Sequence, residues 1–249
     1  SGMPGTAIDW HERSLALSRS TGNRTAAFRA LNGLGIAKWR LGQLDEAISL
    51  LGQVITYCQE IGERYGELIT LVGMAEINCD AARYDLALAQ AHSAIMLSTQ
   101  LGERRSEAGA REVIATVHNR QGRHGEAIAG YGGALRVARE IGFGYGETSI
   151  LIGLASAHRN IGEPDIALAH GEHALVRLRN DGQLLLEATA LIEVAHTHLV
   201  LGNLDKATQL IDQAIQRTDK RGETLTGERA RHVKSLIELQ AGGGGPTLG

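Results

Sequence analysis

Apolar residues recur at helical spacing over almost the whole chain. Leu31 and Leu34 lie on one helical face, and Ala47, Leu51 and Val54 lie on a face of the next segment. A spacing of three or four residues predicts amphipathic helices, each with one buried face. We expect twelve of them, at residues 5–20, 24–40, 44–60, 64–80, 84–100, 104–120, 124–140, 144–160, 164–180, 184–200, 204–220 and 224–240.

Glycines mark the expected ends of these helices. One series, spaced by 40 residues, is Gly22, Gly62, Gly102, Gly142, Gly182 and Gly222. A second series with the same spacing is Gly42, Ala82, Gly122, Gly162 and Gly202. Glycine after a helix adopts positive φ at little cost, so it is typical of helix C-termini. Each 40-residue repeat is therefore predicted to be a pair of helices.

A short signature indicates the family. Residues 41–47 read Leu-Gly-Gln-Leu-Asp-Glu-Ala and residues 201–207 read Leu-Gly-Asn-Leu-Asp-Lys-Ala. This sequence resembles the tetratricopeptide repeat in its longer form of about 40 residues. The resemblance covers nearly the whole chain and implies an all-α, right-handed solenoid of antiparallel helix pairs. Arg111 and Ala82 depart from the family pattern, so the second and third repeats are the least regular.

The resemblance also implies a small residue where the two helices of each pair touch. Small residues occupy these positions: Gly35, Ala75, Ala115, Ala155 and Ala195. The array divides into a half repeat at 5–22, five repeats at 23–222 and a capping helix at 224–240. Residues 1–4 are expected to be a cloning remnant or a disordered start, and residues 241–249 a flexible glycine-rich tail.

The two ends of the array differ in polarity. The first helix has the pattern of a second helix with no first helix before it, which leaves Trp10 and Leu17 without a covering neighbour. We expect an upstream segment or a partner chain to cover them, or a rearranged terminal helix. In the last helix Arg231, Lys234 and Glu238 form a polar outer face, which favours an array that ends there.

Composition narrows the possible partners. The chain has 25 Lys and Arg against 28 Asp and Glu, so a net charge of −3 gives no general reason to expect nucleic acid or an anionic membrane. No apolar run approaches the roughly 18 residues of a membrane span. Two cysteines are too few for a disulfide framework in a chain of this size, which favours the cytoplasm.

No motif predicts catalysis, a metal or a cofactor. His118, His158 and His198 share a register, but equivalent residues of successive repeats lie on the order of 18–20 Å apart, so a packing role is favoured. His170 and His173 share a helical face without an evident third ligand. The glycine-rich stretch 142–146 follows a helix rather than a strand and is interpreted as a linker. We do not expect an enzyme.

The family resemblance implies a groove lined by the first helix of each repeat. The predicted partner-binding residues are Arg29, Asn32, Trp39, Arg40, Glu76, Asp80, Glu112, Asn119, Arg120, Arg159, Asn160 and His196. An exposed Trp39 flanked by Arg29 and Arg40 has the composition of a binding hot spot. The alternative is a solvated groove with one stray aromatic residue.

The function implied by this resemblance is recognition of a protein or peptide segment. The 40-residue form is similar to the C-terminal arrays of actinobacterial signalling regulators, including the Streptomyces antibiotic regulatory protein family and nucleotide-switch ATPases. It also occurs in animal polarity adaptors and motor light chains. We expect the sensor or interaction domain of a larger bacterial transcription regulator. Two alternatives are a self-association module acting through Trp10 and Leu17, and a groove that senses a small molecule.

Overall fold

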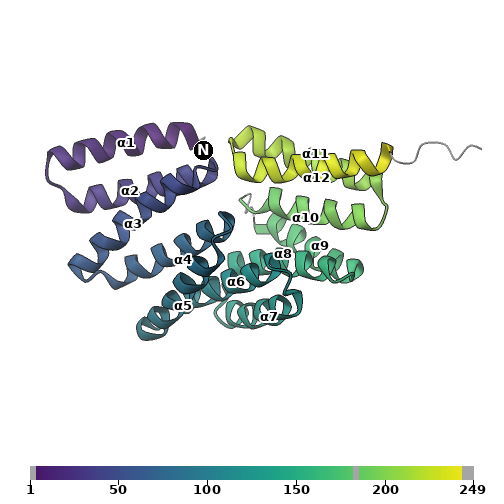
Figure 1. Ribbon diagram of the computed structural model, residues 1–249, viewed down its shortest axis with the longest axis horizontal. Helices are drawn as coiled ribbons and strands as arrows, with labels where there is room; N and C mark the ends of the chain where they lie inside the picture. Colours follow the sequence, from purple (N-terminus) through teal and green to yellow (C-terminus); the bar gives the residue numbers. More distant parts are fainter. Residues whose placement is uncertain (1–3, 182–184, 243–249) are drawn as a thin grey trace, which may run out of the picture. The chain divides into compact units, whose positions relative to one another are not determined.

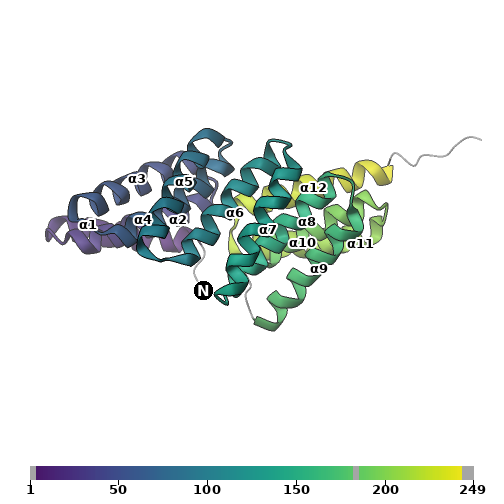
Figure 2. The same cartoon turned by 90° about the horizontal axis from the view of Figure 1, so that it is seen from below.

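The computed structural model describes residues 4–181 and 185–242, which contain twelve α-helices and no strand. Figure 1 shows the helices in chain order, and Figure 2 shows them from below. The helices are α1 (Pro4–Ser20), α2 (Arg24–Arg40), α3 (Leu44–Ile61), α4 (Arg64–Asp80), α5 (Tyr84–Leu101), α6 (Arg104–Arg120), α7 (His124–Glu140), α8 (Gly144–Asn160), α9 (Pro164–Asp181), α10 (Glu187–Val200), α11 (Leu204–Arg221) and α12 (Thr224–Gly242).

Every predicted helix is present in the described part of the chain. Only α10 begins late, at Glu187 instead of residue 184, because residues 185–186 form a turn. The last helix continues to Gly242, two residues beyond the expected 240. The predicted turn residue Gly182, residues 1–3 of the expected start and residues 243–249 of the expected tail lie outside the described residues. The remaining residues of the expected start and tail are helical, since α1 begins at Pro4 and α12 includes Ala241 and Gly242.

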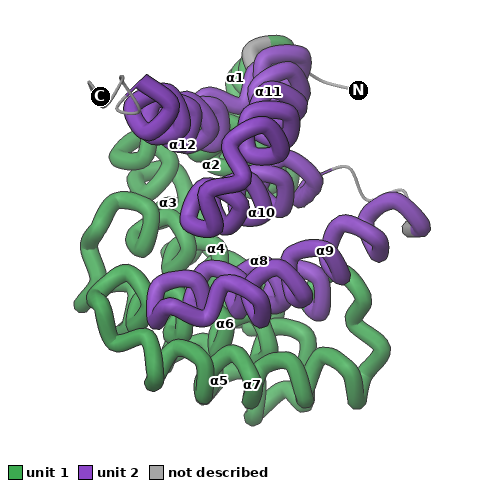
Figure 3. Tube along the Cα trace, turned by 90° about the vertical axis from the view of Figure 1, so that its right-hand side faces the viewer, with its two compact units in different colours: residues 1–146 green, residues 147–249 purple. Residues whose placement is uncertain are grey.

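The helices form two compact units, residues 1–146 and residues 147–249 (Figure 3). The boundary falls in the first turn of α8. In unit 1 each helix from α1 to α7 packs on the next one, and α4 also contacts α6. In unit 2, α9 to α12 pack in the same sequential way, and α10 also contacts α12. We call α2, α4 and α6 the A helices of unit 1, and α8, α10 and α12 those of unit 2.

Positive φ angles confirm the predicted turns. Gly102, for example, ends α5 with φ 68°, and its N–H donates to carbonyl oxygens of the last turn. Ala82 is the one residue other than glycine with positive φ, 57°, among the described residues. Its N–H donates to the Cys79 carbonyl oxygen at 3.1 Å, so the same turn forms there despite the β-carbon. The departure from the family pattern at Ala82 therefore leaves the turn in place.

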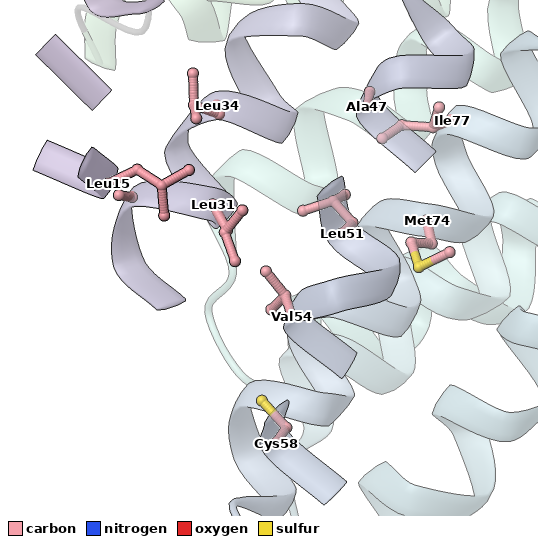
Figure 4. Close-up of a cluster of buried hydrophobic side chains, with 10 residues drawn as sticks. Leu15, Leu31, Leu34, Ala47, Leu51, Val54, Cys58, Met74 and Ile77 are labelled. Carbon is pink, nitrogen blue, oxygen red and sulfur yellow. The ribbon is translucent and has the colours of Figure 1, made fainter. Parts of the chain in front are cut away.

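Small residues let the helix pairs approach closely. Ala75, Ala115, Ala155 and Ala195 are at most 1% exposed, as predicted. At Gly35 a β-carbon would lie 2.7 Å from Leu51 Cδ2, closer than packed atoms tolerate. Figure 4 shows the cluster around this contact, in which leucines from α1, α2 and α3 meet Met74 and Ile77 of α4. Close packing through small residues therefore builds a core with few aromatic side chains, of which Tyr131 is buried.

The end helices present the surfaces expected from the sequence. Trp10 is 70% exposed and Leu17 67% exposed, whereas Leu15 on the same helix is buried. In α12, Val233 and Ile237 are buried. Arg231 and Lys234 remain partly exposed while pairing with Asp219 and Asp212 of α11. No helix of residues 4–181 and 185–242 is long and apolar enough to cross a membrane.

Candidate binding site

The candidate site is the surface of the A helices at five equivalent positions per helix, which we call the A face. In unit 1 these positions hold Arg29, Asn32, Ile36, Trp39, Arg40; Ile69, Val72, Glu76, Cys79, Asp80; and Gly109, Glu112, Thr116, Asn119, Arg120. In unit 2 they hold Ser149, Ile152, Ser156, Arg159, Asn160; Thr189, Ile192, His196, Leu199, Val200; and Arg229, His232, Leu236, Leu239, Gln240. Unit 1 therefore carries three carboxyl groups at these positions, and unit 2 carries none.

Hydrogen bonds join the three A helices of unit 1. The Trp39 indole Nε1 of α2 donates to Asp80 Oδ2 of α4 at 2.8 Å. From α6, Arg120 Nη2 donates to Asp80 Oδ1 at 2.5 Å, and Arg120 Nη1 donates to the Cys79 carbonyl oxygen at 2.7 Å. Asp80 thus accepts from both neighbouring helices. We call Trp39, Asp80 and Arg120 the polar ladder.

Trp39, predicted to be exposed, is half-buried. Its ring is partly buried against the core cluster of α1 to α4, and its one N–H donor is already paired with Asp80. In unit 1 the exposed apolar side chains at A-face positions are instead Ile36, at 40%, and Ile69, at 41%. Arg29 and Arg40 are exposed as predicted, and Asn32 is half-buried.

Glu76 lies beside the polar ladder without a hydrogen bond or ion pair to any residue that the structure describes. Its burial, together with the nearby charges of Glu112 and Asp80, raises its pKa to about 8. The same surroundings act on Tyr145, at the start of α8 within unit 1. Burial, with Glu76 and Glu112 as acidic neighbours, raises its pKa to about 12. Sequence reasoning missed Tyr145 because it treated residues 142–146 only as a linker.

Two A-face positions of α6 face inward rather than toward a ligand. Asn119 is 8% exposed, and its Oδ1 lies 2.7 Å from Nδ1 of His124 on α7. The Thr116 hydroxyl lies 2.9 Å from the hydroxyl of Tyr131, a buried residue of α7 whose pKa burial raises above its ordinary value. The Asn119 side chain, predicted to line the groove, is therefore buried in the contact between α6 and α7.

In unit 2 two arginines share one buried carboxylate. Arg159 of α8 pairs through Nη1 with Glu193 Oε2 of α10, and the two side chains are 8% and 7% exposed. Arg229 of α12 reaches the same carboxylate, with Nη2 at 3.3 Å from Glu193 Oε1. Burial by itself would raise the pKa of Glu193, but Arg159 and Arg229 outweigh it and lower that pKa. The carboxylate is thus held in its charged form.

Sequence reasoning missed Glu193 and Arg229. In the other repeats the position of Glu193 holds only glycine or valine, at Gly33, Gly73, Val113, Gly153 and Val233. A carboxylate in a register of small apolar residues is the signal that could have identified it. Arg229 lies in the capping helix, where the polar residues were interpreted only as a cap.

The predicted residues Arg159, Asn160 and His196 gather near this carboxylate. Arg159 Nη2 lies 3.3 Å from both Ser156 Oγ and Asn160 Oδ1. Burial and the charges of Arg159 and His232, opposed by the charge of Glu193, lower the pKa of His196 to about 4. Its imidazole is therefore neutral at pH 7. Arg159, predicted to line the groove, is only 8% exposed because its side chain is turned into unit 2 toward Glu193.

The other features singled out lie apart from the A faces. His158 stacks on His170 at 5.4 Å between ring centroids, and its Nδ1 lies 2.7 Å from Glu163. No group of three or more His, Cys, Asp or Glu within residues 4–181 and 185–242 could hold a metal ion. A shallow hollow of about 300 Å³ lies at the turns of unit 1, lined by residues 82–86 and Gln121.

A family model described as "Tetratricopeptide repeat" matches residues 1–60, 26–100 and 106–180. No curated protein sequence matches the chain.

Among solved structures, a Rap protein complexed with Competence and Sporulation Factor is 14% identical, with a TM-score of 0.70 over 87% of this chain and 66% of that one. NprR in complex with its cognate peptide NprX is 17% identical, with a TM-score of 0.74 over 96% and 70%. A Signal Transduction ATPase with Numerous Domains from Pyrococcus horikoshii, which has a tetratricopeptide repeat sensor, is 15% identical, with a TM-score of 0.60 over 84% and 31%. At these identities the similarity concerns the fold.

Proposed function

The chain belongs to the tetratricopeptide repeat family, and from this premise we propose that its A faces bind peptide segments of other proteins without catalysing a reaction. The observation that carries the proposal is the polar ladder of unit 1. The ladder fixes α2, α4 and α6 to one another through the side chains of Trp39, Asp80 and Arg120. On the same A helices Ile36 and Ile69 remain exposed.

This arrangement suits recognition for a physical reason. A surface that is already ordered loses little conformational entropy when a ligand binds, so more of the contact energy appears as affinity. Exposed Ile36 and Ile69 offer apolar anchors, while the exposed Arg29 and Arg40 offer charged hydrogen-bond donors. An extended peptide presents both apolar side chains and carbonyl oxygens, so it fits this mixture.

The similar structures support the same proposal. The Rap structure contains Competence and Sporulation Factor, the NprR structure contains its cognate peptide, and the ATPase has its repeats as a sensor. This chain covers 66% of the first of these proteins and 31% of the last. We therefore infer a sensor or interaction domain of a larger, cytoplasmic bacterial transcription regulator. A DNA-binding or nucleotide-switch domain in the same gene product would support that role.

A random peptide display library, selected on the purified chain, tests the proposal. We expect enrichment of peptides whose binding is lost in the double variant Ile36→Asp, Ile69→Asp. The matched control is Arg136→Asp, at an exposed position of α7 outside the A face. Failure to enrich any peptide, or equal binding by the A-face variant, would contradict peptide binding at this surface.

The exposed face of α1 favours a second candidate, self-association. Trp10 and Leu17 are 70% and 67% exposed, and Arg13 lies over the Trp10 ring at 5.5 Å from its centroid. A symmetric dimer would bury both apolar side chains against their copies. Light scattering should show a dimer that Trp10→Glu converts to a monomer. Leu239→Glu on α12, where the leucine is 72% exposed, is the matched control. A monomeric parent chain would contradict this candidate.

A further inference from the structure

Unit 2 has an excess of positive charge on its A face. Arg159 and Arg229 bring two guanidinium groups to one carboxylate, that of Glu193. None of the A-face positions, five on each of α8, α10 and α12, holds an acidic residue that could balance the charge of the second guanidinium. His196 is neutral at pH 7 and does not change this balance. The cluster of Arg159, Glu193, Arg229 and His196, which we call the arginine cluster, therefore carries a net charge of about +1.

Arg159 and Arg229 differ in their burial and in how many of their N–H donors have a hydrogen-bond partner. Arg159 is 8% exposed and makes contacts with Glu193, Ser156 and Asn160. Arg229 is 46% exposed and makes a single hydrogen bond, to Glu193, within the residues that the structure describes. A guanidinium has five N–H donors, so most donors of Arg229 are unused.

His196 adds a second unused group. It lies at an A-face position of α10, near both Arg159 and Glu193. Its ring nitrogens have no hydrogen-bond partner in the described part of the chain. A neutral imidazole can donate one hydrogen bond and accept another. Arg229 and His196 thus border the same carboxylate while keeping free hydrogen-bonding capacity.

We propose that the A face of unit 2 binds a carboxylate group of the peptide ligand through Arg229 and His196. The inference rests on the peptide binding proposed above. Arginine is suited to this task because its planar guanidinium pairs with a carboxylate through two parallel hydrogen bonds. Glu193 acts as a positioning residue, because its carboxylate accepts a hydrogen bond from Arg229 and balances the charge of the buried Arg159. The carboxylate is either an Asp or Glu side chain or the C-terminus of the peptide.

Chemical variants of bound peptides test the carboxylate site. Peptides selected on the purified chain are synthesised in three forms: the parent sequence, a form with every Asp and Glu replaced by Asn and Gln, and a form with an amidated C-terminus. Their affinities are measured by fluorescence polarisation. We expect one of the two altered forms to bind about tenfold more weakly than the parent. The form that loses affinity identifies the source of the carboxylate.

A variant of the protein connects this loss to the cluster. Arg229→Gln should bind the parent peptide about as weakly as the parent protein binds the altered form, so the two changes should not add. Arg179→Gln, at an exposed position of α9, is the matched control and should leave the affinity unchanged. A thermal melt of Arg229→Gln verifies that the variant remains folded.

The outcomes separate this inference from the proposed function. Selected peptides that bind equally well in all three forms would overturn the carboxylate site and leave peptide binding intact. An Arg229→Gln variant that still distinguishes the parent peptide from its altered form would also overturn the assignment. Failure to select any peptide would overturn peptide binding itself, and the carboxylate site with it.

Discussion

The A faces of the two units are built from helices at the same repeat positions, yet they handle charge differently. In unit 1 the Asp80 and Arg120 side chains are 19% and 31% exposed and meet at the surface. In unit 2 the Glu193 and Arg159 side chains are 7% and 8% exposed and meet in the interior. The repeat thus fixes where a helix lies, whereas the individual residues determine how deeply each ion pair is buried.

This difference in depth determines what each pair contributes. A surface pair gains little net free energy, because water already solvates both charges. A buried pair gives up that solvation, and each charge then depends on its partner. Unit 1 should therefore tolerate the loss of one ladder residue, whereas unit 2 should not tolerate the loss of Glu193.

The largest effect is expected for Glu193→Ala. Removing the carboxylate leaves the Arg159 guanidinium buried without compensation, so the free energy of unfolding should fall by about 3–5 kcal/mol. Urea unfolding at pH 7 measures the change. The double variant Arg159→Leu, Glu193→Leu should recover much of the loss, since it removes both buried charges. A loss of less than about 1 kcal/mol would show that the pair is solvated and that the two units do not differ in this way.

The stability of the chain at low pH tests the Arg159–Glu193 pair independently. The pKa of Glu193 is lowered in the folded chain, so its contribution to stability is present above the pKa of the unfolded chain. That contribution is lost as the pH falls through the lowered folded-state pKa.

A smaller effect is expected for Asp80→Ala. The substitution removes the acceptor of both Trp39 and Arg120, but Arg120 keeps its bond to the Cys79 carbonyl oxygen. The free energy of unfolding should fall by about 1–2 kcal/mol. In a Trp10→Phe background, Trp39 is the remaining tryptophan, and its fluorescence should shift because its indole N–H loses its partner. An unchanged spectrum would contradict the ladder.

Glu76→Gln tests the charge of the unit 1 A face through the pH dependence of stability. The folded-state pKa of Glu76 is raised from 4.5 to about 8, so its contribution to stability is full below pH 4.5 and is lost as the pH rises through about 8. The variant cannot ionise, so it should exceed the parent chain in stability at pH 9 and match it near pH 5. After allowance for solvent screening we expect a difference on the order of 1 kcal/mol. Glu12→Gln, at an exposed position of α1, is the control. Parallel pH profiles for parent and variant would contradict the raised pKa.

The smallest effect concerns the turn after each A helix. Unit 1 has Ala82 with φ 57° at a position where unit 2 has Gly162 and Gly202, with φ 80° and 75°. Ala82→Gly should raise the free energy of unfolding by about 0.5–1 kcal/mol, because positive φ strains an L-residue. Gly202→Ala should lower it by a similar amount, since nothing lies within 4 Å of the added β-carbon and only the backbone is strained. Thermal melts of the two variants measure both changes in stability, and shifts of the same sign would contradict the explanation.

The sequence by itself determined the helices, the turns and the small residues of the core. Helix periodicity and the glycine series are local signals, because a helix forms hydrogen bonds within itself and a positive φ belongs to one residue. For this reason even Ala82, a departure from the pattern, sits in the predicted turn. The buried alanines followed from the same repeat, since close helix pairs need a small residue at each crossing.

Only the tertiary structure decided which A-face residues are open to a ligand. A small rotation of a helix about its axis separates an exposed side chain from a buried one, and periodicity cannot resolve that rotation. Trp39, Asn119 and Arg159 were therefore predicted to line a groove, yet each is partly or fully buried and hydrogen-bonded.

Pairing between helices was equally beyond the sequence. Glu193 meets Arg159 and Arg229 across separations of 34 and 36 residues, and such contacts form only when three separate helices pack together. Local sequence thus specifies the repeats. The pairing of charged groups at each A face depends on contacts between helices, which exist only in the folded array.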